Sequence, residues 1–408
     1  MSQAPPRHRV ILHIDVDAFF VSAELTLRPE LRGQAVAISS GGANAVVTAL
    51  SYCAKQRGAR VPMKLRTVRH LCPDVVVLKP NLALYSRLAN QIYQHLRRRY
   101  TRRIEIGSID EWFLDVSWLW KAYGGVYQLG QTIQTDLLQT FGLEVSIGIS
   151  QTKFLAKMAT GLHKPFGITI MRPADIASTI WPLAIERYWG IGPRRAAALR
   201  AAGITTIGAL ARCSATNQQL RAIFKERTAV VLAQARGQDQ EPIRPASNEL
   251  TLVANSLTFS GGPEQNFASV CQLLRVVCQL VAARLHERCL VGTRMGLNLK
   301  LAGGRTISAS HHLNHPVVAE AALYNQGLRL LEQLWTDQAI IGVGVSLGNL
   351  HSQYRGLVPL RLFDPPAPNV VQTIINQINH KMGQLVVVSL REYQDNRALR
   401  AGQSKYIK

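Results

Sequence analysis

The sequence predicts an α+β protein of several domains, and three observations support this. Residues 10–172 alternate strand-like and helical patterns, residues 173–236 are rich in Ala, Leu and Arg and look all-helical, and residues 248–350 again mix strands with helices. Strands and helices in such mixed order predict an α+β architecture. A chain of 408 residues is also too long for one compact domain.

In the first region, alternation of Val10, Leu12, Ile14 and Val16 with His13, Asp15 and Asp17 predicts a strand. Two short apolar runs around a Gly-Gly turn, 35–38 and 45–48, predict a strand pair. The remaining patterns of this region predict helices over 50–57, 64–71, 82–100, 125–141 and 151–165, and Pro165 ends the last of them. They also predict strands over 75–80, 102–116 and 144–150, the second of which contains a Gly-Ser turn.

The later regions are separated by polar or proline-rich stretches. "GQDQEPIRPAS" at 237–247 predicts a linker, and "DPPAP" at 364–368 breaks the chain within a tail, 351–408. Between them, the patterns predict strands over 251–258, 291–301, 306–311 and 340–347, and helices over 267–288 and 317–335.

The composition indicates a polyanionic partner. Lys and Arg number 47 against 25 Asp and Glu, for a net charge of +22. Nucleic acid is the first candidate and an anionic membrane surface the second. We expect a cytoplasmic protein without a membrane span, since no uncharged apolar stretch is long enough and no secretory signal precedes the first acids. The six cysteines form no CxxC pair, which favours reduced thiols.

Carboxylates are scarce, yet "IEIGSIDEWFLDV" at 104–116 places Asp110 beside Glu111 in an apolar run. Asp15 ends another apolar strand. Buried carboxylates need a partner, and two hypotheses remain open. The acids pair with the arginines at 97–103, or they bind a divalent metal ion such as Mg²⁺, which prefers carboxylate oxygens. Adjacent strand residues point to opposite faces, so the pair shares one site only if the Gly-Ser turn skews that end. Asp115 is predicted to be structural or paired at the surface.

Five motifs in order resemble Y-family DNA polymerases, the translesion class that includes bacterial DNA polymerase IV. They are "HIDVDAFFVSAE" (13–24), "ALSYCAKQRGAR" (49–60), "SIDEWFLDV" (108–116), "SIGISQTKFLAKMATGLHKPFG" (146–167) and "WGIGPRRAAALRAAGI" (189–204). The resemblance implies a right-hand polymerase with a ferredoxin-like palm (1–18 and 81–171), small fingers (19–80), a helical thumb with a helix-hairpin-helix (172–236), a linker (237–247) and an α+β little finger (248–350).

The resemblance also implies site residues. Asp15, Asp110 and Glu111, with the Val16 carbonyl, would hold two Mg²⁺ ions for nucleotidyl transfer, whereas Asp17 would be no ligand. The nucleotide-binding residues would be Phe19, Phe20 as a steric gate against the ribose 2′-OH, Tyr52, Lys55 and Lys164. The family usually has Arg where Lys55 stands and often Thr where Ala49 stands, which puts the details of triphosphate binding in question.

Contacts to DNA are expected in two domains. Gly190, Gly192 and Arg194 of "WGIGPRR" would bind the backbone in the thumb, and Arg294, Lys300 and Arg305 would touch phosphates in the little finger. Lys153 and Lys157 lie four residues apart on one helical face, and two hypotheses apply to them: a solvated face, or contact with DNA or nucleotide. "PLRLFD" at 359–364 resembles a sliding-clamp peptide anchored by Leu360, Leu362 and Phe363.

The predicted function is low-fidelity, template-directed addition of dNTPs to a primer 3′-OH by a monomeric enzyme that associates with the nucleoid when active. Two alternatives stay open. A nucleotidyl cyclase also uses two carboxylate-bound metals on a ferredoxin-like sheet, although the Gly-x-Gly thumb argues against it. A DNA-binding accessory protein descended from a polymerase is the non-enzymatic alternative, against which the intact acidic residues argue.

Overall fold

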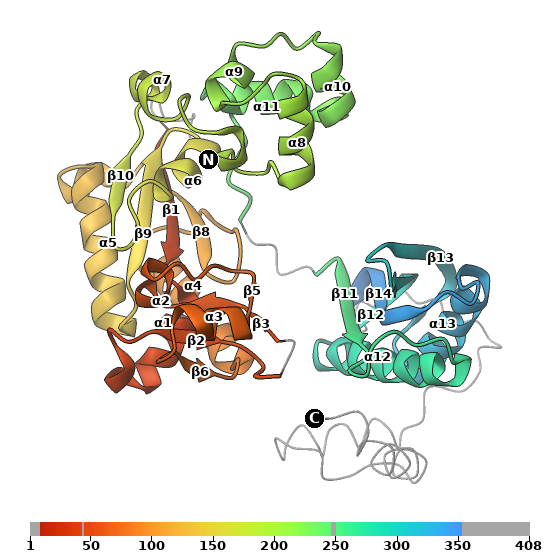
Figure 1. The fold of residues 1–408 in the computed structure, drawn as a ribbon. Coiled ribbons are helices and arrows are strands. Elements are labelled where there is room, and N and C mark those ends of the chain that lie inside the picture. Colours follow the sequence, from red (N-terminus) through yellow and green to blue (C-terminus); the bar gives the residue numbers. More distant parts are fainter. Residues whose placement is uncertain (1–8, 43–44, 246–249, 353–408) are drawn as a thin grey trace. The chain divides into compact units, whose positions relative to one another are not determined.

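The computed structural model describes residues 9–42, 45–245 and 250–352. The chain divides into two compact units, Met1–Ala246 and Ser247–Lys408. Figure 1 shows the elements of both.

A five-stranded sheet of order β10-β9-β1-β8-β7 is the centre of the first unit. Strand β1 pairs antiparallel with β8 and β9, β7 pairs antiparallel with β8, and β10 pairs parallel with β9. The strands are β1 (Ile11–Val16), β7 (Ile104–Ile106), β8 (Glu111–Asp115), β9 (Val145–Ser150) and β10 (Ile168–Ile170). Strands β9-β1-β8-β7, with α4 (Leu82–Arg99) directly before β7 and α5 (Val126–Phe141) between β8 and β9, form the βαββαβ arrangement of a ferredoxin-like palm.

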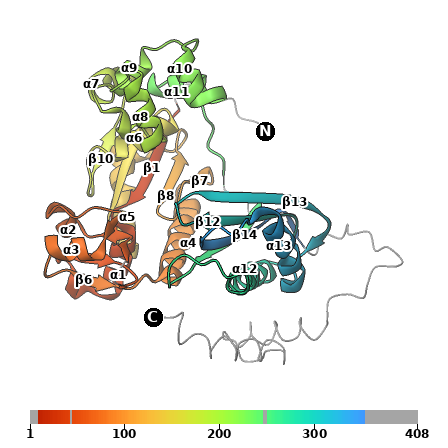
Figure 2. The ribbon, with the colours of Figure 1, turned by 45° about the vertical axis from the view of Figure 1, so that its right-hand side comes forward.

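Helices cover both faces of this sheet (Figure 2). Leu12, Ile14 and Val16 of β1 pack in one core with α4 (Leu82–Arg99) and α5 (Val126–Phe141). Ile11, on the alternate face, packs with Ala156 of α6 (Lys153–Thr160). Strand β1 is therefore buried on both faces. The predicted extension of the last helix to Pro165 is wrong, because α6 ends at Thr160.

The predicted fingers region has the expected helices but different strand pairing. Strand β2 (Val36–Ile38) pairs antiparallel with β4 (Ala49–Leu50) and parallel with β6 (Val76–Leu78). The predicted partner run instead forms β3 (Val46–Val47), which pairs with β5 (Met63–Lys64). The hairpin prediction was wrong because pairing depends on long-range packing rather than on the nearby turn. The helices of this region are α1 (Phe19–Leu27), α2 (Tyr52–Gln56) and α3 (Leu65–Leu71).

Residues 173–235 are helical throughout their regular elements, as predicted. A separate core containing Leu199, Leu210 and Leu232 holds them together. The helices are α7 (Ile176–Thr179), α8 (Pro193–Ala201), α9 (Ile207–Ala211), α10 (Gln218–Phe224) and α11 (Thr228–Ala235), with short 3-10 helices at Pro173–Asp175, Ile185–Arg187 and Lys225–Arg227.

The described part of the second unit is an antiparallel sheet of order β11-β14-β12-β13 with two helices packed on one face. Its elements are β11 (Leu252–Thr258), α12 (Phe267–Glu287), β12 (Leu290–Leu301), β13 (Thr306–Val317), α13 (Glu320–Leu334) and β14 (Ile340–Ser352). Helix α12 is long and apolar enough to cross a membrane by length and composition alone. Its Leu274, Val277 and Val281 are fully buried in the core of this unit, as in a core helix of a soluble domain.

Candidate active site

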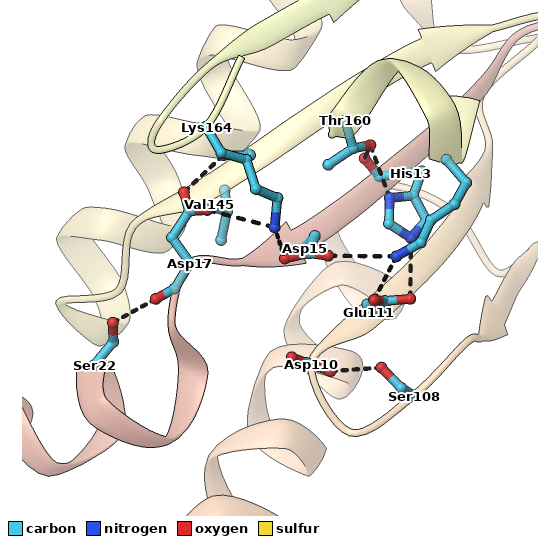
Figure 3. A network of polar contacts seen from close by, with 12 residues as sticks. His13, Asp15, Asp17, Ser22, Ser108, Asp110, Glu111, Val145, Thr160 and Lys164 are labelled. Carbon is cyan, nitrogen blue, oxygen red and sulfur yellow. Dashed lines mark hydrogen bonds and ion pairs between the residues drawn. The ribbon is translucent and has the colours of Figure 1, made fainter. Parts of the chain in front are cut away.

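Asp15 and Glu111 are direct cross-strand neighbours in the palm sheet. The antiparallel register pairs Asp15 of β1 with Glu111 of β8, so both side chains lie on the same face (Figure 3). His13, two residues before Asp15, lies on that face as well. One ligand atom from each of His13, Asp15 and Glu111 lies within 4.8 Å of the others. Like charges placed opposite each other destabilise a sheet, so this pair requires compensating cations.

Asp110 occupies a different position from its neighbour, because β8 begins only at Glu111. The turn before the strand is closed by Gly107, whose N–H donates to the Glu111 carbonyl at 2.9 Å. The Asp110 carboxylate accepts a hydrogen bond from Ser108 Oγ at 2.5 Å. Its backbone carbonyl accepts from the Val16 N–H at 3.0 Å. The structure thus brings Asp15 and Glu111 together, while Asp110 adjoins them through its backbone and directs its carboxylate to Ser108.

Two lysines compensate the charge of the paired acids. Lys157 Nζ forms an ion pair with Glu111 Oε1 and lies 3.4 Å from Asp15 Oδ2. Lys164 pairs with the other oxygen of Asp15. The hypothesis of arginine partners is wrong for Asp15 and Glu111, because their partners are Lys157, Lys164 and, for Glu111, also His13.

Asp115, at the far end of β8, does pair with an arginine. Its Oδ2 lies 3.4 Å from Arg103 Nη1, and its Oδ1 accepts from Ser117 Oγ at 2.6 Å. These contacts agree with the structural role expected for Asp115.

The three clustered groups have shifted pKa values. Burial raises the pKa of Asp15 to about 6, although Lys164 and Lys157 oppose the shift. Burial also raises the pKa of Glu111, but hydrogen bonds from His13 and Lys157 outweigh it, so the net shift is downward. Burial lowers the pKa of His13 to about 4, which keeps its ring neutral at physiological pH. Carboxylate oxygens in this donor set suit a hard divalent cation such as Mg²⁺.

Asp17, two residues after Asp15, is held by hydrogen bonds from three segments distant in sequence. Its Oδ2 accepts from Ser146 Oγ at 2.7 Å and from the Phe166 N–H at 2.8 Å, and its Oδ1 accepts from the Tyr52 hydroxyl at 3.0 Å. Only 1% of Asp17 is exposed. These bonds join the palm to helix α2 and to the segment after Lys164.

The expected triphosphate-binding residues lie around this junction. Lys55 Nζ is 4.5 Å from the centroid of the Tyr52 ring. Burial lowers the pKa of Lys55, and the nearby positive charge of Lys164 lowers it further. The structure therefore places Tyr52, Lys55 and Lys164 in one cationic cluster. Thr48, the neighbour of Ala49, has its hydroxyl donating to the Ile38 carbonyl at 3.1 Å.

The two phenylalanines of α1 differ in environment. Phe19 is 3% exposed and packs in the palm core, so its side chain lies in the core of the domain. Phe20 is partly buried, and its ring stacks on Tyr85 with centroids 4.4 Å apart and 11° between the planes.

Lys153 contradicts the expectation that it contacts DNA or nucleotide. It is 3% exposed, and its Nζ lies 2.6 Å from Glu105 Oε1 and 3.3 Å from Glu241 Oε1. Ile243 packs nearby on the cluster around Phe113. The first part of the predicted linker therefore docks on the palm through Lys153. Although Lys153 and Lys157 are four residues apart on one helix, Lys153 binds Glu105 and Glu241, whereas Lys157 binds Asp15 and Glu111.

The expected DNA-binding residues of the thumb are exposed at the start of α8. Gly190 has a φ of +97°, which an L-residue adopts at a cost, and Gly192 is the N-cap of the helix. Arg194 is exposed in its first turn.

In the second unit, Arg294 and Lys300 are exposed on the same face of β12, and Arg305 is exposed in the turn after it. Leu360, Leu362 and Phe363 lie outside the described residues.

Sequence reasoning assigned no role to His13. The signal was present, since His13 and Asp15 are separated by one residue in a strand and must share a face. A polar side chain of 0% exposure beside a candidate metal ligand is a stronger indication than the sequence pattern alone.

Comparison with protein families gives three matches in chain order. Residues 14–161 match the impB/mucB/samB family, residues 173–204 match the helix-hairpin-helix motif of that family, and residues 252–357 match its C-terminal domain.

Curated relatives and solved structures agree with these matches. A DNA polymerase IV of Bacillus anthracis is 31% identical over 385 residues, covering 93% of this chain and 92% of the relative. DNA polymerase IV 1 of Bacillus subtilis is 28% identical over 94% of this chain and 93% of the relative. A Y-family DNA polymerase chimera superimposes with a TM-score of 0.74 at 20% identity, covering 84% of this chain and 99% of the chimera.

Proposed function

This chain belongs to the Y-family of DNA polymerases, in its bacterial DNA polymerase IV branch, and we propose that Asp15, Asp110 and Glu111 form its metal-binding centre. Membership makes it a DNA-directed DNA polymerase of the translesion type that uses divalent metal ions. The cyclase and accessory-protein alternatives find no support in these comparisons. The bacterial relatives also support a soluble, cytoplasmic protein.

The observation that carries the proposal is the register that places Asp15 opposite Glu111 on one face. We propose that these carboxylates, the Val16 carbonyl and Asp110, after rotation of its side chain away from Ser108, hold two Mg²⁺ ions. Such ions would lower the pKa of the primer 3′-OH and neutralise charge on the triphosphate and its leaving oxygens. The residues of the chain then act chiefly by positioning and charge compensation.

The cationic cluster next to the carboxylates would bind the incoming nucleotide. Tyr52, Lys55 and Lys164 would donate charge-assisted hydrogen bonds to phosphate oxygens. Lys55 offers a point charge rather than the fork of an arginine. Phe20, braced by its stack on Tyr85, would exclude a ribose 2′-OH, and Phe19 would support that side of the pocket from the core.

Primer–template DNA would be held by contacts to its backbone. The backbone N–H groups around Gly190 and Gly192, together with Arg194, would bind phosphates at the start of α8. Arg294, Lys300 and Arg305 would bind phosphates along the little finger without reading sequence. We further propose that the enzyme is a monomer and docks on the sliding clamp through Leu360, Leu362 and Phe363.

Primer extension tests the metal-binding assignment. Asp110→Ala should abolish extension of a labelled primer in Mg²⁺ and dNTPs. Asp115→Ala is a matched control, because it removes a carboxylate from the far end of the same segment. Undiminished extension by Asp110→Ala would contradict the assignment. Equal losses in both variants would indicate damage to the strand rather than loss of a ligand.

A further inference from the structure

His13 connects helix α6 to the carboxylate of Glu111 from within the palm core. Its Nε2 lies 3.4 Å from Glu111 Oε2, and its Nδ1 lies 2.8 Å from Thr160 Oγ1. The ring is 0% exposed and packs on Phe113 with centroids 4.5 Å apart. Figure 3 shows the line of contacts from Thr160 through His13 to Glu111.

The donors and acceptors in this line fix the tautomer of the ring. Thr160 Oγ1 also lies 2.9 Å from the Ala156 carbonyl and 3.3 Å from the His13 carbonyl, and one hydroxyl proton cannot serve all three neighbours. If Thr160 donated to either carbonyl, His13 would carry its proton on Nδ1, and an Nε2 lone pair would face a carboxylate that can only accept. The favourable arrangement has Thr160 donating to Nδ1 and the Nε2–H of His13 donating to Glu111.

Both oxygens of Glu111 are then held. Oε1 pairs with Lys157, which is on the same helix as Thr160, and Oε2 accepts from His13. Asp110, in contrast, is held by Ser108 of an exposed turn. Glu111 is thus the acid whose orientation depends on a fully buried partner. Partners that hydrogen-bond a metal ligand typically affect metal affinity.

We propose that His13, oriented by Thr160, is a positioning residue that fixes the Glu111 carboxylate for binding of the divalent metal. This inference rests on the proposed role of Glu111 as a ligand. His13 need not touch the metal, since imidazole is a poor ligand for Mg²⁺. Because Thr160 is on α6, the contacts through Thr160 and His13 also connect the Glu111 carboxylate to that helix. The position of α6 therefore determines the geometry of the metal site.

The test measures binding of Mn²⁺ by electron paramagnetic resonance, with a dideoxy-terminated primer–template and a matching dNTP. His13→Leu and Thr160→Val should each weaken Mn²⁺ binding by about tenfold or more, and should raise the Mg²⁺ concentration for half-maximal extension to match. His13→Gln, whose amide can still donate, and Thr160→Ser should stay near the wild type. Ser150→Ala is the control, because it removes a buried hydroxyl bonded to the Met171 carbonyl at the other end of the sheet.

Several outcomes would overturn the inference. The inference is wrong if both His13→Leu and Thr160→Val bind Mn²⁺ with wild-type affinity. If His13→Leu does not fold, wild-type Mn²⁺ affinity in Thr160→Val is enough to overturn it. A ¹⁴N coupling from His13 in the Mn²⁺ spectrum would replace positioning by direct ligation. Glu111→Gln separates the two proposals. If it binds Mn²⁺ normally, the ligand assignment fails and this inference with it; if it loses Mn²⁺ while His13→Leu does not, only the positioning role fails.

Discussion

The approach of α6 to the palm sheet depends on the absence of a side chain at Gly148. Gly148 of β9 is the register partner of His13. A Cβ at this position would lie 2.0 Å from the Ala156 carbonyl oxygen and 2.5 Å from both the N and Oγ1 of Thr160. Ordinary contact begins at 3.4 Å, so in Gly148→Ala the helix must retreat by about 1.4 Å. Two of these three atoms, the Ala156 oxygen and the Thr160 nitrogen, belong to the backbone, so rotation of a side chain would not relieve the clash.

The consequence of Gly148→Ala should appear in both stability and catalysis. Overpacking of this kind costs about 1–3 kcal/mol in the free energy of unfolding. Displacement of Lys157 and Thr160 by about 1 Å should lower kcat/KM for single-nucleotide extension by roughly 10²-fold. Urea denaturation and steady-state extension measure the two effects.

Gly161→Ala is the matched control, because a Cβ there would lie 3.5 Å from the Met158 carbonyl oxygen, an ordinary contact at the end of the same helix. Wild-type kcat/KM in Gly148→Ala would refute the argument that the site depends on how closely this helix approaches.

Three further predictions follow from individual contacts. Phe20→Val should raise ribonucleotide incorporation relative to dNTP incorporation, measured as a ratio of kcat/KM values; an unchanged ratio would remove Phe20 as the gate. Lys153→Met should destabilise the protein by about 2–3 kcal/mol, because Glu105 and Glu241 lose their shared cation, yet leave the Kd for primer–template DNA unchanged; weaker DNA binding at full stability would restore the original expectation. Burial would raise the pKa of Asp136, but hydrogen bonds from His95 and Tyr100 outweigh it, and the net shift is downward. The ionised carboxylate therefore adds to the free energy of unfolding at neutral pH, and this stabilisation is lost as pH falls through the lowered pKa. Asp136→Asn should therefore cost about 2 kcal/mol at pH 7 and progressively less in acid, and a penalty independent of pH in urea titrations would contradict this.

Much of the fold follows from local patterns. The alternation in β1 and the amphipathic periodicity of α4 and α5 depend only on neighbouring residues, and these elements form where they were predicted. Strand partners in the fingers were mispredicted, because β2 pairs with a run closer to α2 and with the distant β6. The two lysines of α6 were treated alike, although one lies in the core and the other reaches the carboxylates. Their difference depends on which elements pack on each side of the helix.

The sequence by itself supplied the candidate residues for the chemistry and, within a strand, which of them share a face. The two-residue period of a strand places His13 with Asp15, and the five ordered motifs identify the family. Only the tertiary structure decided that Asp15 is opposite Glu111, that Asp110 belongs to the turn, and that His13 reaches Glu111. Strand register and the approach of the helix are set by packing between segments about a hundred residues or more apart, and no local pattern encodes those distances.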